Sequence, residues 1–183
     1  MVKSEVIPID KNYPSEETSL DDALEGNLNG LYRFALRLSG SVDQAQDLTQ
    51  EAAVRAWERR DTTVQNWRAW LFQTLYHAFI SNQRRSKRWR EEEAGDPEMT
   101  ESGSCADPLP ALVAEVDVRR ALESLPEHLR IVVWLSDGED FRLREIATIL
   151  DCPIGTVASR LARARGALRQ MLSVYGTRKT REI

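Results

Sequence analysis

The stretch Phe141–Tyr175, FRLREIATILDCPIGTVASRLARARGALRQMLSVY, decides the fold of this 183-residue chain. Its first part predicts a short helix with one apolar stripe, because apolar residues recur there at three- and four-residue spacing: Leu143, Ile146, Ala147 and Leu150. Asp151-Cys152-Pro153 then predicts a tight turn, since proline disfavours the α conformation in the preceding residue and suits the first turn of a new helix. The pattern is that of a helix-turn-helix.

The second helix of this pattern has two contrasting sides. The side predicted to be buried carries Ile154, Val157, Leu161, Ala164, Leu168, Met171 and Leu172. The opposite side carries Ser159, Ala162, Arg163, Gly166 and Gln170, flanked by Arg160, Arg165 and Arg169. No acidic residue occurs between Gly155 and Gln170, although the whole chain has 29 acidic and 25 basic residues. Small residues let a backbone approach a groove and arginines reach phosphates or base edges, so this side is predicted to bind DNA rather than to be a solvated charged face.

The segment EIATILDCPIGTVASRLARARGAL resembles region 4.2 of bacterial sigma-70 family sigma factors of the extracytoplasmic-function (ECF) group. The corresponding family stretch reads much like EIA-x-x-L-x-x-P-x-GTV-x-SR-x-x-RAR. The resemblance implies contacts to the −35 promoter element from Thr156, Ser159, Arg160, Ala162, Arg163 and Arg165. One departure is Ala158, where family members commonly carry a basic residue.

Composition excludes several other classes of protein. A hydrophobic fraction of 42% is enough for packed cores, so the chain is not expected to be disordered. No apolar run approaches the roughly 20 residues of a membrane span, and no signal peptide is evident, which predicts a cytoplasmic protein without membrane insertion. Cys105 and Cys152 lack metal-ligand spacing and predict reduced thiols, while His77 and His128 lie in different domains. We therefore expect no metal, no cofactor, no small-molecule substrate and no enzymatic activity.

Charge is distributed in alternating blocks. The net charge is −4 overall, yet residues 31–90 carry 11 basic and 5 acidic residues, and residues 119–183 carry 12 and 8. Residues 1–30 carry 2 basic and 7 acidic residues, and residues 91–118 carry 9 acidic residues and no basic one. This pattern predicts two nucleic-acid-facing domains that are joined and preceded by acidic segments.

The first domain is predicted to begin at Ser19, an N-capping serine followed by two aspartates, after a disordered tail over residues 1–18. A helix then runs to Gly40 with an apolar stripe of Leu24, Leu28, Leu31, Ala35 and Leu38. The next helix, from Ser41, has a core stripe and a second face that holds Asp47, Gln50, Glu51 and Val54. This face resembles region 2.2 of sigma factors, which implies docking on the clamp coiled coil of core RNA polymerase.

After a loop over residues 60–66, a long helix is predicted from NWRAWLFQTLYHAFISNQRRSKRWR. Trp70, Leu71 and Leu75 are predicted core residues, whereas five of the seven residues from Arg84 to Arg90 are basic, with Trp89 among them. Such a run suits contacts to phosphates and stacking on unpaired bases. The helix resembles regions 2.3 and 2.4, which implies binding of the −10 element by Thr62, Thr63, Asn66, His77, Arg84, Arg85, Lys87 and Arg88. His77 and Ser81 depart from the asparagine and aspartate usual in the family.

We therefore predict an all-α chain with two small helical domains, at residues 19–90 and 111–176, joined by a flexible acidic linker over residues 91–110 and followed by a tail over 177–183. The resemblance implies an ECF sigma factor whose partners are core RNA polymerase (clamp coiled coil and flap), promoter DNA and an anti-sigma factor. Two alternatives are a sigma-like adaptor that titrates an anti-sigma factor and an ordinary helix-turn-helix regulator. The adaptor should lack the arginine face, and the regulator leaves the Trp/Arg-rich helix without a role.

Overall fold

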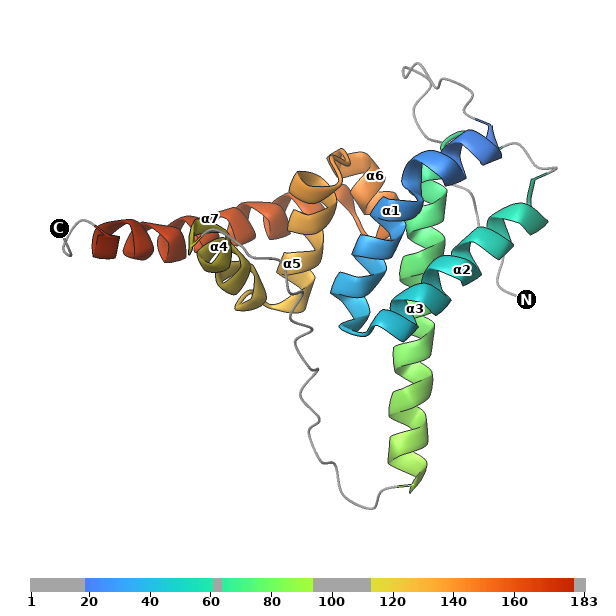
Figure 1. The fold of residues 1–183 in the computed structure, drawn as a ribbon, viewed down its shortest axis with the longest axis horizontal. Coiled ribbons are helices and arrows are strands. Elements are labelled where there is room, and N and C mark those ends of the chain that lie inside the picture. Colours follow the sequence, from blue (N-terminus) through green and yellow to red (C-terminus); the bar gives the residue numbers. More distant parts are fainter. Residues whose placement is uncertain (1–18, 61–63, 94–112, 180–183) are drawn as a thin grey trace.

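The computed structural model describes residues 19–60, 64–93 and 113–179, and within these ranges all regular structure is helical (Figure 1). The first domain consists of α1 (Leu20–Ser39), α2 (Val42–Glu58) and α3 (Trp67–Glu93). The second domain consists of α4 (Val113–Glu123), α5 (Glu127–Val133), a π-helical turn η1 (Trp134–Gly138), α6 (Leu143–Ile149) and α7 (Ile154–Lys179). The predicted all-α fold with two helical domains is confirmed.

Side-chain and glycine caps set the ends of the first helices. The Ser19 hydroxyl accepts a hydrogen bond from the backbone N–H of Asp22 at 3.1 Å. Gly40 ends α1 with a left-handed φ of 65°, and its N–H donates to the Leu36 carbonyl at 2.9 Å. Ser41 then caps α2. Both predicted helix starts and the predicted glycine stop are therefore confirmed, because each depends only on neighbouring residues.

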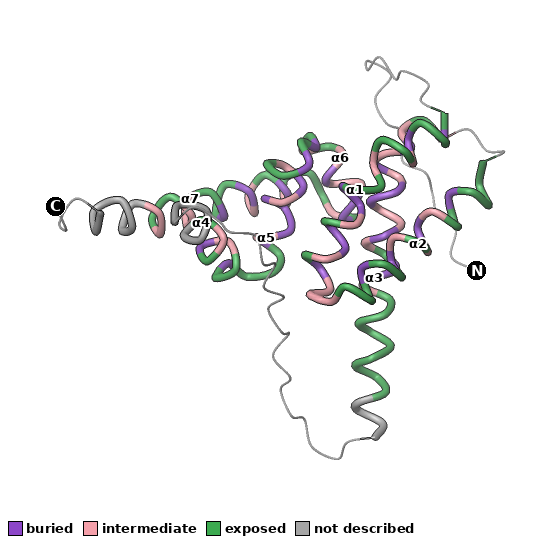
Figure 2. Tube along the Cα trace, viewed as in Figure 1, coloured by how far each residue is buried: buried purple, intermediate pink, exposed green. Residues whose placement is uncertain are grey.

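The three helices of the first domain enclose an aromatic and aliphatic core. Leu31, Phe34 and Leu71 have no exposed surface, and the Phe34 and Phe72 ring centroids lie 5.5 Å apart. Leu28, predicted in the α1 stripe, is instead 41% exposed. The far half of α3 leaves this core, and its residues 81–89 are all exposed (Figure 2). The structure continues α3 to Glu93, three residues into the predicted linker.

The second domain contains the predicted helix-turn-helix. Asp151 adopts a left-handed φ of 48° after α6, the Cys152 N–H donates to the Ala147 carbonyl at 3.0 Å, and the Asp151 N–H donates to the Thr148 carbonyl at 3.3 Å. This pair of hydrogen bonds is a Schellman motif. The prediction that Ile154 is buried is wrong, since it is 45% exposed. At 100° per residue Ile154 lies 60° from Val157, at the edge of the stripe and at the first residue of the helix.

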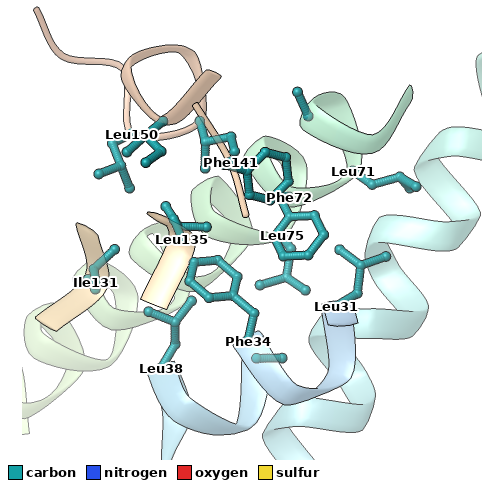
Figure 3. Close-up of a cluster of buried hydrophobic side chains, with 14 of the residues drawn as sticks. Leu31, Phe34, Leu38, Leu71, Phe72, Leu75, Ile131, Leu135, Phe141 and Leu150 are labelled. Atoms are coloured by element: carbon teal, nitrogen blue, oxygen red, sulfur yellow. The ribbon is translucent and has the colours of Figure 1, made fainter. Parts of the chain in front are cut away.

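The two domains share one hydrophobic core, a feature that the sequence did not reveal. Phe141 of the second domain is 3% exposed, and its ring lies edge-on to Phe72 of α3 with centroids 4.8 Å apart. Figure 3 shows Leu135 and Phe141 against Phe34 and Phe72. The structure continues α7 to Lys179, three residues into the predicted C-terminal tail. The predicted N-terminal tail, residues 180–183, most of the predicted linker, Thr62, Thr63 and Cys105 lie outside the described residues.

Candidate nucleic-acid and polymerase-binding surfaces

The predicted DNA-binding side of α7 faces away from the core. Val157, Leu161 and Ala164 are buried on the opposite side, whereas Ala162 and Arg163 are exposed. Thr156, Ser159 and Arg160 are half-buried, and the Ser159 hydroxyl donates to the Thr156 carbonyl at 3.0 Å. A shallow depression follows along the same helix, lined by Arg163, Gly166, Ala167, Arg169 and Gln170. Small residues and arginines therefore form one continuous surface that a groove of DNA could approach.

Arg165 differs from its neighbours because it has an internal partner. Its Nη2 lies 2.5 Å from Oδ1 of Asp137 and 3.3 Å from the Ser136 hydroxyl, both in η1. The hydrogen bond from Arg165 holds the pKa of Asp137 below its usual range. Arg165 is thus directed toward η1 in this structure, while Arg163 remains open to solvent.

Most predicted −10 residues within the described ranges lie on the exposed part of α3. His77, Arg84, Arg85, Lys87 and Arg88 are all exposed. The Arg85 guanidinium donates to the Asn82 side-chain oxygen at 3.2 Å. Trp89 is 59% exposed beside this basic run, so an aromatic ring and several cations are available on one projecting helix.

Asn66 is brought to the second domain instead. Its Oδ1 accepts from the Ala69 N–H at 2.9 Å at the start of α3, and its Nδ2 donates to Oε1 of Glu145 in α6 at 2.9 Å. About two turns further along α3, Nε2 of Gln73 donates to the Thr148 carbonyl at 2.8 Å. The first helix of the helix-turn-helix therefore covers the beginning of the predicted −10 helix.

Tyr76 of α3 is influenced by both predicted DNA-binding surfaces. Burial raises the pKa of its phenol, and the charge of Glu127 adds to this effect. Arg160 of α7 and Arg84 of α3 act in the opposite direction.

The predicted polymerase-binding face lies on α2. A shallow depression is lined by Asp47, Gln50, Glu51, Val54, Arg55 and Glu58. Glu51 forms an ion pair with Arg55 at 2.6 Å, and Val54 is 51% exposed. The four predicted residues therefore do come together on one face.

Sequence reasoning missed Trp57, which lies one turn beyond Val54. Its ring is 53% exposed, and the Arg60 guanidinium carbon lies 5.1 Å from the ring centroid. An exposed aromatic beside an acidic depression is a typical anchor for a partner protein. The sequence did contain a signal for Trp57: residues three positions apart on a helix are neighbours on its surface, so Trp57 adjoins Val54 on the predicted face.

Two further features can be stated for residues 19–60, 64–93 and 113–179, one about metal-binding clusters and one about membrane-spanning helices. Among these residues there is no group of three or more His, Cys, Asp or Glu side chains that could hold a metal. None of the helices in residues 19–60, 64–93 and 113–179 is both long and apolar enough to cross a membrane. Cys152 is a half-buried free thiol.

Comparisons with known proteins agree with this geometry. Residues 24–90 match the family model for Sigma-70 region 2, and residues 115–168 match that for Sigma-70, region 4. The ECF RNA polymerase sigma factor EcfG of Rhodopseudomonas palustris is 35% identical over 86% of this chain and 87% of its own length. SigL of Mycobacterium tuberculosis, also an ECF RNA polymerase sigma factor, is 36% identical over 80% of this chain and 84% of its own length.

A solved structure is also similar over most of its length. It is the sigma factor RpoE from Bartonella quintana in complex with the anti-sigma factor NepR. The similarity has a TM-score of 0.69 at 33% identity and covers 84% of this chain and 96% of that one. The chain therefore belongs to the sigma-70 family of RNA polymerase sigma factors, in its extracytoplasmic-function group. As a sigma factor it is a transcription initiation factor that directs core RNA polymerase to promoters.

Proposed function

We propose that α7 reads the −35 element as duplex DNA, that α3 and the loop before it capture the melted −10 element, and that α2 docks on the clamp of core polymerase. The observation that carries this proposal is the two-sided character of α7. Its apolar side is buried, and its other side exposes Arg163 beside Ala162. A helix of this kind can enter a major groove with arginines directed at base edges and phosphates.

At the −35 element we propose contacts from Thr156, Ser159, Arg160, Ala162, Arg163 and Arg165. Arg163 is free to make a bidentate contact with a base or a phosphate. Arg165 must first leave Asp137, and because this pair is about half exposed its loss costs little, on the order of 0–1 kcal/mol. Arg165 is therefore expected to contribute less than Arg163.

At the −10 element we propose that Arg84, Arg85, Lys87 and Arg88 bind the phosphate backbone and that Trp89 stacks on an unpaired base. The loop with Thr62, Thr63 and Asn66 would hold a base flipped out of the stack, with His77 further along α3. Base flipping costs a few kcal/mol, so it requires contacts that compensate for lost stacking.

Toward the polymerase we propose that Asp47, Gln50, Glu51 and Val54 form the docking face, extended by Trp57. The second domain would contact the flap. Because RpoE of Bartonella quintana forms a complex with an anti-sigma factor, we also propose an anti-sigma partner for this chain. The protein would act in the cytoplasm, as a binding protein without catalytic activity of its own.

Run-off transcription with purified core RNA polymerase tests this function. Genomic fragments serve as templates, and sequencing of the transcripts identifies the promoter. We expect transcripts only when the chain is present, and a strong decrease for Arg163→Ala. A chain that co-purifies with an anti-sigma protein but yields no transcripts would be the adaptor. A chain that binds DNA but never assembles with core polymerase would be an ordinary regulator.

A further inference from the structure

Ile154 is a large apolar side chain that the fold leaves exposed at the start of α7. Seven such residues in the described part of the chain are exposed: Leu28, Val42, Val54, Trp57, Trp89, Val118 and Ile154. Of these seven, only Ile154 lies on α7, where it is the first residue of the helix. Val157, three positions later, has no exposed surface. The chain therefore carries an isoleucine at a point of α7 that its own core does not cover.

The start of α7 holds Ile154 in a defined position. The Pro153 carbonyl accepts hydrogen bonds from the N–H groups of Thr156 at 2.8 Å and Val157 at 3.2 Å. Proline restricts its own backbone φ, and a β-branched side chain such as isoleucine has one strongly preferred χ1 rotamer in a helix. Contact with a partner therefore costs Ile154 little conformational freedom.

The exposed row that begins at Ile154 continues into the predicted DNA-binding side of α7. Ala158 lies one turn further, rotated by roughly 40° about the helix axis, and Ala162 lies one turn beyond it. Both alanines are exposed, and Ala162 adjoins the exposed Arg163 in sequence. In a helix-turn-helix, residues near the N-terminus of the second helix contact base edges. Ile154 therefore lies at the end of the DNA-binding surface where bases are read.

The surroundings of Ile154 on this helix are small and uncharged. No charged residue occurs between Gly155 and Ser159, and Ala158 stands where resemblance to the family predicts a basic residue. A Cβ added to Gly155 would meet nothing within 4 Å, so the backbone there is uncovered on that side. Because neither Gly155 nor Ala158 has a long side chain, neither holds a base edge away from Ile154.

The chemistry of isoleucine selects one feature of the major groove. Its side chain has no hydrogen-bond donor or acceptor, so it cannot replace the water that polar base edges lose on contact. Thymine presents a C5 methyl group in the major groove, and an apolar side chain can pack against it. A protein partner fits this edge less well. The residues one and two turns further are alanines, whereas the core of a protein interface is rich in large apolar side chains.

We propose that Ile154 is a specificity-determining residue of the −35 contact, which packs against the C5 methyl group of a thymine in the major groove. This inference rests on the proposed function of α7. Arg163 supplies hydrogen bonds to a base or a phosphate, and Ile154 adds selection for an A·T pair near the N-terminal end of the helix. The apolar contact takes the place of the basic contact that Ala158 cannot make.

The test uses holoenzyme reconstituted from core polymerase and the full-length chain, with a promoter duplex mapped by run-off transcription. Each thymine of its −35 element is replaced in turn by deoxyuridine, which lacks only the C5 methyl group. Affinity is measured by competition against a fluorescently labelled copy of the parent duplex. We expect one replacement to weaken binding by the parent holoenzyme about fourfold, the factor for burial of one methyl or methylene group.

The variant Ile154→Ala should lose the same contact from the protein side. Its holoenzyme should bind the parent duplex about fourfold to tenfold more weakly, because the shorter side chain cannot reach the methyl group. The sensitive deoxyuridine replacement should then have no further effect. Such non-additivity identifies a direct interaction between the two groups that were removed.

Two other variants serve as controls. Val42 is the first residue of α2 and is 46% exposed, so Val42→Ala shortens a similar side chain at a helix start outside the proposed DNA-binding surfaces. This variant should keep both the parent affinity and the fourfold response to deoxyuridine. Arg163→Ala should weaken binding to every duplex and still show the fourfold response, because the methyl contact remains.

An equal response of parent and Ile154→Ala holoenzymes to every deoxyuridine replacement would overturn the proposal, as would a −35 element without A·T pairs. Weaker assembly of Ile154→Ala with core polymerase in gel filtration, with unchanged affinity of the holoenzyme for the duplex, would also overturn it and identify a polymerase contact. Failure of the proposed function has a different signature. In that case the parent yields no transcripts, or Arg163→Ala binds the promoter duplex as tightly as the parent.

Discussion

Asn66 and Glu145 join the predicted −10 loop to the first helix of the helix-turn-helix by a 2.9 Å hydrogen bond. Both oxygens of the Glu145 carboxylate are used, because Oε2 accepts from the Arg142 N–H at 2.9 Å and so caps α6. A residue proposed to contact DNA is thus occupied by the domain proposed to read the other promoter element. Binding of DNA by Asn66 requires this hydrogen bond to break.

The arginine face of α7 provides the first prediction. Arg160→Ala and Arg163→Ala should each weaken binding to the −35 element, and a lost bidentate base contact should cost about 1–3 kcal/mol. We expect one substitution to relax base preference and the other to act uniformly through phosphate. Fluorescence anisotropy with duplexes at fixed salt measures this, with Arg165→Ala as a comparison of smaller effect. Unchanged affinity for both variants would mean that the face is only a solvated surface.

The second prediction concerns the acidic depression on α2. Charge reversal in the double variant Asp47→Lys/Glu51→Lys should reduce assembly with core polymerase, because both side chains line the exposed depression. The domain should remain folded, since the buried stripe with Leu48 is untouched; loss of the Glu51–Arg55 pair costs only about 0.3–0.5 kcal/mol. Gel filtration with core polymerase measures assembly, and Gln46→Lys on an exposed part of α2 is the control. Normal assembly of the double variant would refute the assignment.

The turn of the helix-turn-helix provides a prediction about stability. Asp151 has a left-handed φ of 48°, a conformation that glycine adopts without steric cost. Asp151→Gly should therefore stabilise the protein by about 0.5–1 kcal/mol and raise Tm by a few degrees, whereas Asp151→Ala should lower it. Thermal unfolding, monitored by circular dichroism, distinguishes the effects of the two substitutions. A lower Tm for the glycine variant would show that the aspartate side chain stabilises the turn.

The pair of Asp137 and Arg165 predicts a pH dependence. The hydrogen bond from Arg165 lowers the pKa of Asp137 below its unfolded value of 3.8. The stabilisation is therefore fully present above pH 3.8 and is lost as pH falls through the lower pKa of the folded protein. Because both side chains are about half exposed, Asp137→Asn should cost less than about 1 kcal/mol at neutral pH. Urea unfolding at several pH values should show this difference shrinking below pH 3.8; a difference that persists in strong acid would contradict the ion pair.

The acidic linker leads to a further prediction, which concerns DNA binding by the free protein. The linker is tethered between two basic domains and can compete with phosphates for their arginines. Neutralisation of five carboxylates to amides should tighten DNA binding at low salt, with an advantage that shrinks as salt rises. Three of them end α3 (Glu91, Glu92 and Glu93), and two lie in the linker beyond it (Asp96 and Glu98). Anisotropy across a salt series measures this. Equal affinities of parent and variant at every salt concentration would leave the linker as a spacer only.

The sequence alone predicted the features that depend on near neighbours. Ser19 and Gly40 mark the ends of α1 because capping involves residues three or four positions apart. The turn at Asp151 and the buried stripe with Val157 follow from the same short-range geometry. Ile154 shows the limit of this reasoning, since periodicity places a residue on a side of a helix but does not say where the covering element ends.

Only the tertiary structure decided how the two domains meet. Nothing in the pattern around Glu139 distinguishes it from a solvated acid, and nothing around Gly30 distinguishes it from a helix defect. The structure buries the Glu139 carboxylate beside Gly30 and the Arg33 guanidinium, more than 100 residues away in sequence, because a buried carboxylate needs both space and a cation. Local patterns therefore determined the helices, the helix-turn-helix and its arginine face. The burial of Glu139 and Phe141 against the first domain, and with it the arrangement of the two domains, depends on packing between distant surfaces that no local pattern encodes.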